Sequence, residues 1–512
     1  MKLTTFGDDA RIAFANLWDA ATGFTAPTVR LGVTGLSRAG KTVFITALVH
    51  NLIHGGRLPM LEAMAKGRIA RGYLEPQPDD GVPRFAYEEH VRTLVEDRMW
   101  PNSTRRISEL RLTLEFESSR FMARNLGGGR LSIDIVDYPG EWLLDLPLLG
   151  KDYATWSREA LALARLPNRS GLAAAFLGRL GAIDPHGAED EATARELSVV
   201  FTDYLRACRA DEHALSTLPP GRFLMPGDME GTPALTFAPL DLDAALGAGL
   251  VAARPLAAMM ERRYESYKDL VVRPFFRDHF ARLDRQIVLV DALAALNAGP
   301  AAVADLETAL ADILDCYRPG RTSLLSSLVS RKIDRILFAA TKADHLHHVS
   351  HDRLEAILRR LVKRAAERAA FAGAEVEVAA IAAVRATREA MVKHEGESLP
   401  AIIGTPLPGE AWDGEIFDGN GEIAMFPGDL PLDPEVALRG VKASIQAARP
   451  AGSSSDSDSG RSSGDGGSGG SDLKFLRFRP PRLEVTAEGL TLSLPHLRLD
   501  RALEFLIGDK LT

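Results

Sequence analysis

The spacing of apolar residues changes along the chain and predicts a different type of structure in each part. Short apolar runs alternate with segments of helical spacing over residues 29–144 and 284–395, which predicts an α/β domain with a mixed, mostly parallel sheet. Residues 145–283 keep helical spacing and are rich in Ala, Leu and Arg, which predicts an inserted helical domain. Residues 396–512 carry many Gly and Pro residues between short alternating runs, which predicts a β-rich C-terminal extension.

Individual elements follow from the same pattern. In the α/β part we expect strands at 29–34, 107–116, 130–137, 286–291, 334–340 and 376–382, and helices at 42–49, 301–315 and 352–371. The strands at 107–116 and 130–137 are expected to form an antiparallel pair at one edge of the sheet. Residues 55–103 are interrupted by Gly and Pro, which predicts a long irregular connection.

The two ends of the chain show patterns of their own. Residues 1–28 are expected to contain an amphipathic helix, at 10–22. Residues 452–471 hold mainly Ser, Gly and Asp, which predicts a disordered tract because nothing in it can build a core. Further strands are expected at 473–478, 482–486 and 490–494, with a terminal helix at 500–507.

Composition narrows the class of protein. At 512 residues and 46% hydrophobic content, the chain has enough apolar material for several packed cores. A net charge of −8 argues against a nucleic-acid partner or bulk attachment to anionic lipid. Cys208 and Cys316 have no His or Cys at metal spacing, and no apolar run reaches membrane-spanning length. We therefore expect a cytoplasmic protein, and leave open whether it associates peripherally with the inner membrane.

Residues 35–42 carry the strongest chemical signal. Their sequence, GLSRAGKT, fits the G-x-x-x-x-G-K-[ST] phosphate-binding pattern, and it lies between an expected strand and an expected helix. Gly35 and Gly40 allow the backbone to curl so that successive N–H groups face phosphate oxygens. Lys41 is expected to reach the β- and γ-phosphates, and the Thr42 hydroxyl to bind Mg²⁺. The intervening Ser37, Arg38 and Ala39 are expected to contribute to the same phosphate site.

A second set of residues fits the metal side of such a site. Asp137 ends an apolar strand and is followed by Gly140, as a metal-side carboxylate and a γ-phosphate-sensing glycine would be. Thr104 is the candidate switch threonine that binds Mg²⁺, with Ser103 as its competitor. Glu141 is a candidate for orienting the attacking water, although a carboxylate beside a triphosphate is electrostatically unfavourable. We therefore expect slow hydrolysis, with Arg38, Arg105 and Arg106 as candidates for a stabilising arginine.

Base recognition is predicted at the end of a later strand. Residues 341–344 read TKAD and fit the [NT]-K-x-D pattern, in which a carboxylate accepts two N–H groups that guanine has and adenine lacks. Asp344 would select guanine, Lys342 would pack over the base, and Thr341 would tie this loop to the phosphate loop. Ala383 and Val384, after the last strand, would flank the base from the other side.

Taken together, these motifs resemble those of the bacterial YcjX-like P-loop NTPase family. The similarity covers GVTGLSRAGKT at 32–42, Trp100-Pro101, DYPGEW at 137–142, DRQ at 284–286, TKAD at 341–344 and the terminal segment 495–506. It implies a Ras-like GTPase core with helical additions, and a family linked to envelope stress and often described only as an ATPase. Position 141 departs from the Ras pattern, because the water-orienting Gln of that pattern is replaced by Glu141.

Several hypotheses about function remain open on the sequence. The first is a switch that binds GTP or GDP with Mg²⁺, hydrolyses GTP slowly and controls an unidentified protein effector, with an inner-membrane protein as one candidate. The others are an ATP-driven motor or chaperone-like ATPase, and a nucleotide-stabilised scaffold that does not hydrolyse. The sequence does not give the oligomeric state. It also leaves open whether Trp142, Leu143 and Leu144 form an exposed switch surface or part of the core.

One further cluster has two interpretations. His345, His347, His348 and His351 follow the guanine motif closely and could bind metal. The interpretation favoured by the sequence is a solvated approach to the next helix, because no Cys or acidic ligand nearby in the chain completes a metal site.

Overall fold

The computed structural model describes residues 27–36, 38–102, 104, 106–118, 129–210, 212–242, 253–315, 333–394, 397–412, 414–438, 475–483 and 493–512. The predictions for the N-terminal helix, the tract at 452–471, Ser37, Ser103, Arg105 and Cys316 lie outside these residues.

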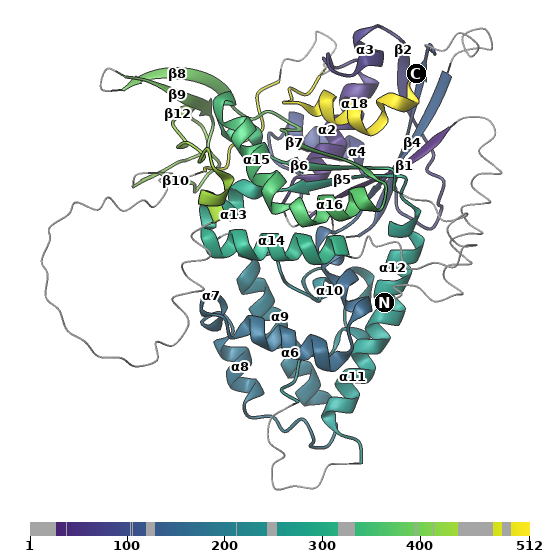
Figure 1. The fold of residues 1–512 in the computed structure, drawn as a ribbon, viewed down its shortest axis with the longest axis vertical. Helices are drawn as coiled ribbons and strands as arrows, with labels where there is room; N and C mark the ends of the chain where they lie inside the picture. The colour runs from purple at the N-terminus through teal and green to yellow at the C-terminus, as the bar shows by residue number, and fades with distance from the viewer. Residues whose placement is uncertain are drawn as a thin grey trace, which may run out of the picture.

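Seven strands of the described chain form one sheet in the order β2-β3-β4-β1-β5-β6-β7 (Figure 1). The strands are β1 (Thr28–Gly35), β2 (Ile69–Glu75), β3 (Ser108–Phe116), β4 (Gly129–Asp137), β5 (Arg285–Val290), β6 (Arg335–Ala340) and β7 (Glu375–Ala380). Strands β4, β1, β5, β6 and β7 run parallel, whereas β2 and β3 are antiparallel to their neighbours. The predicted α/β fold with a mixed, mostly parallel sheet is therefore confirmed.

Helices cover both faces of this sheet because its central strands are apolar on both sides. One face presents Leu31 and Val33 of β1 to α2 (Lys41–Ile53) and to the terminal helix α18 (Leu499–Ile507). The other face presents Val288 of β5 to α13 (Ala292–Ala298), α14 (Pro300–Asp315), α15 (His351–Leu361) and α16 (Lys363–Phe371). The single helix expected at 352–371 is thus two helices, interrupted at Val362.

The connection expected to be irregular between residues 55 and 103 contains regular structure. It holds α3 (Glu62–Ala65), α4 (Tyr87–Val95) and strand β2, which pairs with β3 and forms the edge of the sheet. The expected pair at 107–116 and 130–137 does form, but β4 also pairs with β1, so only β2 has a free edge on this side of the described sheet. Strand β2 was missed because none of its residues is fully buried, so its sequence shows no apolar run.

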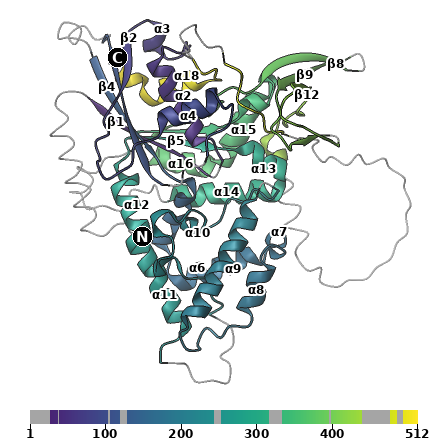
Figure 2. The ribbon, with the colours of Figure 1, turned by 180° about the vertical axis from the view of Figure 1, so that it is seen from behind.

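Between β4 and β5 the chain builds the helical insertion, which Figures 1 and 2 show as a tapering body beside the sheet. Its longer helices are α6 (Tyr153–Ala164), α9 (Glu191–Arg209) and α11 (Leu256–Tyr267). Shorter elements connect them, in chain order α7 (Pro167–Ser170), α8 (Ala174–Leu180), α10 (Gly221–Leu224), η2 (Gly227–Met229), η3 (Pro233–Leu235), η4 (Lys268–Val272), α12 (Arg273–Asp278) and η5 (Phe280–Arg282).

The insertion begins with η1 (Gly140–Gly150), directly after the Asp137 strand. Trp142, Leu143 and Leu144 are buried here in the hydrophobic cluster of the insertion. The structure therefore decides between the two interpretations of these residues, and it places them in the core.

The C-terminal part begins with strands β8 (Arg388–His394), β9 (Glu397–Gly404) and β12 (Ile423–Met425), which form an antiparallel sheet projecting from the body (Figure 1). The expected domain boundary at residue 395 falls inside the β8–β9 hairpin. The small pair β10 (Ala411–Trp412) and β11 (Glu415–Ile416) follows. In the described part of the strand expected at 473–478, the only regular pairing is a single bridge between Pro406 and Phe478, so no continuous strand forms there. The strands expected at 482–486 and 490–494 lie mostly outside the described residues.

The last helix returns to the main sheet. The buried guanidinium of Arg285 on β5 donates to the Leu506 carbonyl of α18 and pairs with Asp334 and with Asp509 of η8 (Gly508–Lys510). The sheet and the chain terminus are thereby joined by a buried charged network.

Candidate functional site

The phosphate loop follows β1 and ends at the first residue of α2. Gly40 is the residue before the helix and has a φ of 83°, a left-handed conformation that glycine adopts without strain. A Cβ on Gly35 would lie 2.6 Å from the Leu289 carbonyl oxygen, so only glycine fits between the loop and β5. The Lys41 ammonium donates to the Gly35 carbonyl at 3.0 Å and is thereby held over the loop.

Three oxygen-bearing side chains meet beside this loop. The Thr104 hydroxyl donates to Asp137 Oδ2 at 2.7 Å and lies 3.2 Å from the Thr42 hydroxyl. Asp137 is buried, and its other oxygen, Oδ1, has no hydrogen-bond partner among the described residues. Burial raises the pKa of Asp137 to about 6, although the charge of Lys41 and the Thr104 hydrogen bond oppose this shift. An unpartnered carboxylate oxygen beside two hydroxyls fits the oxygen ligands that Mg²⁺ prefers.

Gly140 lies directly against the phosphate loop. A Cβ at this position would be 1.8 Å from the Gly35 carbonyl oxygen and 2.9 Å from Lys41 Nζ. The start of η1 therefore touches the place where the predicted γ-phosphate contacts converge.

The predicted base motif lies at the other end of the same region. Asp344 belongs to η6 (Ala343–His345), is 5% exposed, and its Oδ2 accepts the Ala386 N–H at 2.7 Å. Lys342 has a left-handed backbone with a φ of 60°, and its ammonium pairs with Asp291. The Thr341 hydroxyl donates to the Val290 carbonyl, so in this structure it ties the motif to β5 and not to the phosphate loop.

One cavity of about 300 Å³ joins the two ends. Most of the predicted site residues line it, namely Arg38, Ala39, Gly40, Lys41, Thr42, Thr104, Glu141, Thr341, Lys342, Asp344, Ala383 and Val384. Gly35, Asp137 and Gly140 do not line it but contact residues that do. Of the candidate stabilising arginines that the structure describes, Arg38 lines the cavity, whereas Arg106 is exposed and does not. The other described site residues come together across more than 300 residues of sequence.

Glu141 has a partner that the sequence did not reveal. Its Oε1 accepts from Arg209 Nη1 at 3.0 Å, and the carboxylate is 5% exposed. Arg209 is the last residue of α9 in the insertion, 68 positions away. The Arg209 guanidinium neutralises the negative charge of Glu141, which would otherwise be unfavourable beside a triphosphate. A second cavity of about 270 Å³ shares Arg38 and Glu141 with the first and is also lined by Arg209.

The C-terminal part contributes residues to the wall of the main cavity that were not predicted from the sequence. Arg477 and Phe478 line the main cavity, and the Trp100 indole donates to the Phe478 carbonyl at 2.6 Å. Arg98 donates to the Pro480 carbonyl in the same way. The segment before Thr104 is therefore attached to residues 475–483. The motif resemblance at Trp100-Pro101 was the one signal in the sequence that marked this contact.

The histidines after the base motif are not a solvated approach to a helix. His345, His347 and His351 are buried, and only His348 is exposed. Burial lowers the pKa of His345, His347 and His351, which favours neutral imidazoles. An acidic side chain does complete the group, because Glu389 of β8 lies beside His347 and His348. The sequence interpretation failed since Glu389 is distant in the chain and reaches the histidines only through the fold.

The sheet order, the phosphate loop and the cavity define the class of the protein as a P-loop NTPase with a Ras-like core. The chain belongs to the YcjX-like family (DUF463), whose profile matches residues 29–511. It is 38% identical to the Ras-like GTPase YcjX of Escherichia coli K12 over 491 residues, which cover 94% of this chain and 96% of that protein. It is 33% identical to the Ras-like GTPase YcjX of Shewanella oneidensis over 500 residues, 94% of each chain. In the described residues, no helix has the length and apolar character needed to cross a bilayer.

Proposed function

We propose that this protein is a molecular switch that binds GTP and GDP with Mg²⁺, hydrolyses GTP slowly and passes the nucleotide state to its helical insertion. The observation that carries the proposal is the single cavity with two distinct ends. The phosphate loop and the Thr42 and Thr104 hydroxyls line one end, where Thr104 is hydrogen-bonded to the buried Asp137, and the buried Asp344 lines the other. The names of the relatives, both called Ras-like GTPases, support the same assignment.

At the phosphate end, each residue has a role that its position supports. Thr42, Thr104 and Asp137 would hold Mg²⁺, which supplies positive charge against the phosphates. Lys41 would leave the Gly35 carbonyl to contact the β- and γ-phosphates. The Glu141 carboxylate, oriented by Arg209, would accept a hydrogen bond from the attacking water. Because the Glu141 carboxylate is engaged in a salt bridge with Arg209, it is a weaker hydrogen-bond acceptor for water, and we expect slow turnover without a partner.

The route from nucleotide to insertion runs through η1. Gly140 touches the phosphate loop, and five residues later the Asp145 carboxylate accepts the Gly221 N–H at 2.7 Å and the Tyr267 hydroxyl at 2.6 Å. The Trp142 indole donates to the Met225 carbonyl at 3.0 Å. A displacement of Gly140 by a γ-phosphate would therefore be transmitted to α10 and α11.

Base specificity provides the decisive test. We would titrate the purified protein with GDP, ADP and non-hydrolysable analogues of GTP and ATP in Mg²⁺ by calorimetry, and repeat the titrations with Asp344→Asn. The wild type should bind guanine nucleotides and not adenine nucleotides. The substitution should weaken GDP binding by roughly 100-fold or more, because the base loses its carboxylate acceptor. Asp352→Asn is the matched control, since its side chain is 90% exposed and near the same motif in the chain.

Xanthosine diphosphate separates loss of recognition from loss of folding. Xanthine has a carbonyl where guanine has its amino group, so the amide N–H of Asp344→Asn can donate to it. The variant should therefore bind this nucleotide more tightly than the wild type does. Equal or stronger binding of ADP by the wild type would overturn the guanine assignment and support the ATPase hypothesis.

A further inference from the structure

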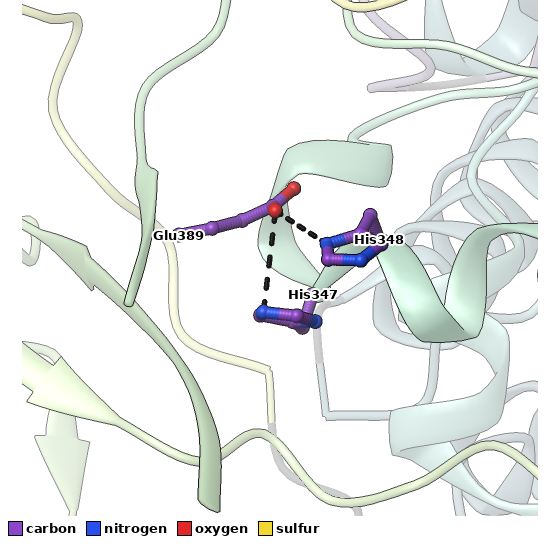
Figure 3. A group of neighbouring side chains, drawn as sticks. All are labelled: His347, His348 and Glu389. Atoms are coloured by element: carbon purple, nitrogen blue, oxygen red, sulfur yellow. Dashed lines mark hydrogen bonds and ion pairs between the residues drawn. The ribbon is translucent and has the colours of Figure 1, made fainter. Parts of the chain in front are cut away.

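We propose that His347, His348 and Glu389 form a binding site for a divalent transition-metal ion of the Zn²⁺ type, separate from the nucleotide cavity. Figure 3 shows the two imidazoles and the carboxylate facing one another. His347 and His348 lie at the start of η7 (His348–Ser350), whereas Glu389 comes from β8, so the fold brings the three together. None of the three lines the nucleotide cavity.

The distances suit a small ion. One oxygen, Glu389 Oε2, lies 2.6 Å from His348 Nδ1 and 4.0 Å from His347 Nε2, and ligand atoms of all three residues lie within 4.8 Å of one another. Zinc bonds of about 2.0–2.2 Å in tetrahedral geometry separate neighbouring ligand atoms by roughly 3.3 Å. The observed separations lie on both sides of this value. The ion would take the place of the hydrogen bond between His348 and Glu389. To reach the tetrahedral separations, each of the three side chains would need to move by less than about 1 Å.

The imidazole of His347 lacks hydrogen-bond partners among the described residues. Its side chain is 8% exposed, and its Nδ1 is buried with no hydrogen-bond partner among the described residues. Its Nε2, at 4.0 Å from the carboxylate, is too distant for a hydrogen bond. The Nε2 atom faces Glu389 without a hydrogen bond to it, and a metal ion bound there would give this nitrogen a partner.

The donor set and its exposure indicate the kind of ion. Two imidazoles and one carboxylate suit Zn²⁺ and its neighbours and do not suit Mg²⁺, which prefers oxygen ligands. Arg385 contacts the other carboxylate oxygen, Oε1, at 3.5 Å and leaves Oε2 to the metal. The His348 side chain is 63% exposed, so water can complete the coordination. A bound ion would join the loop after Asp344 to the projecting β8–β9 hairpin.

The test is a titration of the full-length, untagged and chelator-treated protein with Zn²⁺, in excess Mg²⁺ so that oxygen-rich sites are filled. We expect one Zn²⁺ per chain with a dissociation constant of about 1 µM or tighter. His348→Gln and Glu389→Gln should each weaken it at least about tenfold. Both changes are at partly exposed side chains and should leave the fold intact. His186→Gln, in the insertion, is the matched control and should bind like the wild type.

Co²⁺ provides a second readout that does not depend on affinity alone. Its visible absorption should be intense in the wild type, as in four- or five-coordinate sites, and should be weak in both variants. Absence of tight Zn²⁺ binding by the wild type overturns the proposal, and so does tight binding that survives in either variant. Neither result bears on the guanine assignment, because no nucleotide is present.

Discussion

At the scale of single residues, the phosphate end of the cavity depends on one buried carboxylate. Oδ2 of Asp137 accepts a hydrogen bond from the Thr104 hydroxyl, and Oδ1 has no partner among the described residues. Burial raises its pKa to about 6, so a proton competes with Mg²⁺ for this group close to neutral pH.

The pH dependence of Mg²⁺ binding follows from this competition. The gain in GDP affinity that Mg²⁺ provides should be complete well above pH 6 and should shrink by up to about tenfold per pH unit below it, because the protonated carboxyl cannot bind the ion. Calorimetric titrations with GDP, in Mg²⁺ and in a chelator, at about pH 5.5 and about pH 7.5 measure this gain. Asp137→Asn should show little gain at either pH. An equal gain for the wild type at both values would exclude Asp137 as a metal ligand.

At the scale of elements, η1 is the part on which the nucleotide site and the insertion both depend. Its first residue contacts the phosphate loop, and its next residue contacts the first residue of α10. A Cβ on Gly221, the first residue of α10, would lie 1.7 Å from the Glu141 carbonyl oxygen. The two backbones are therefore packed as closely as glycine permits, and they have no side chain between them that could adjust.

Gly221→Ala should consequently force α10 away from η1. We expect a loss of about 1–3 kcal/mol in the free energy of unfolding, the usual cost of overpacking a core. Gly178→Ala is the control, since apart from its chain neighbours and the backbone of its own helix α8, no heavy atom of a described residue lies within 4 Å of its Cβ position. The control should be neutral or stabilising by roughly 0.5–1 kcal/mol, as for alanine replacing glycine in a helix. Urea unfolding measures both, and equal stability of the two variants would contradict the close packing.

At the scale of the whole molecule, the helical insertion meets the sheet domain at the nucleotide site and also at α14, where Arg169 forms a buried salt bridge with Asp305. The core of the insertion includes Tyr138 and Trp142, which belong to the segment that follows Asp137. The salt bridge between Arg209 and Glu141 adds a charged contact from α9 to the same segment. A change at the γ-phosphate is thus expected to alter the insertion more than the distant face of the sheet.

Amide hydrogen exchange tests this expectation directly. Replacing GDP by a non-hydrolysable GTP analogue should change protection in α9 and α10, whereas α16, on the outer face of the sheet, should serve as an unaffected internal control. Arg209→Gln should reduce the difference between the two nucleotides, because it removes the contact between Glu141 and α9. Identical exchange in α9 and α10 with both nucleotides would show that the insertion does not respond to the nucleotide.

The sequence by itself determined the parts that depend on local patterns. The phosphate loop, the central strands and the long helices could be predicted because phosphate binding needs glycines at fixed spacing, and because buried strands and amphipathic helices repeat with fixed periods. These features were sufficient to predict the α/β core and the inserted helices, while the resemblance of the motifs indicated the family; the structure and the relatives confirm all three.

Only the tertiary structure decided which distant residues meet. Strand β2 exists because β3 offers it a partner, and its own half-exposed residues give no signal. Arg209 meets Glu141 and Glu389 meets His348 across 68 and 41 positions, through contacts that no local spacing encodes. The physical reason is that pairing of side chains depends on the packing of whole elements, and this packing sets the charge balance of the site as well as the position of the proposed metal ion.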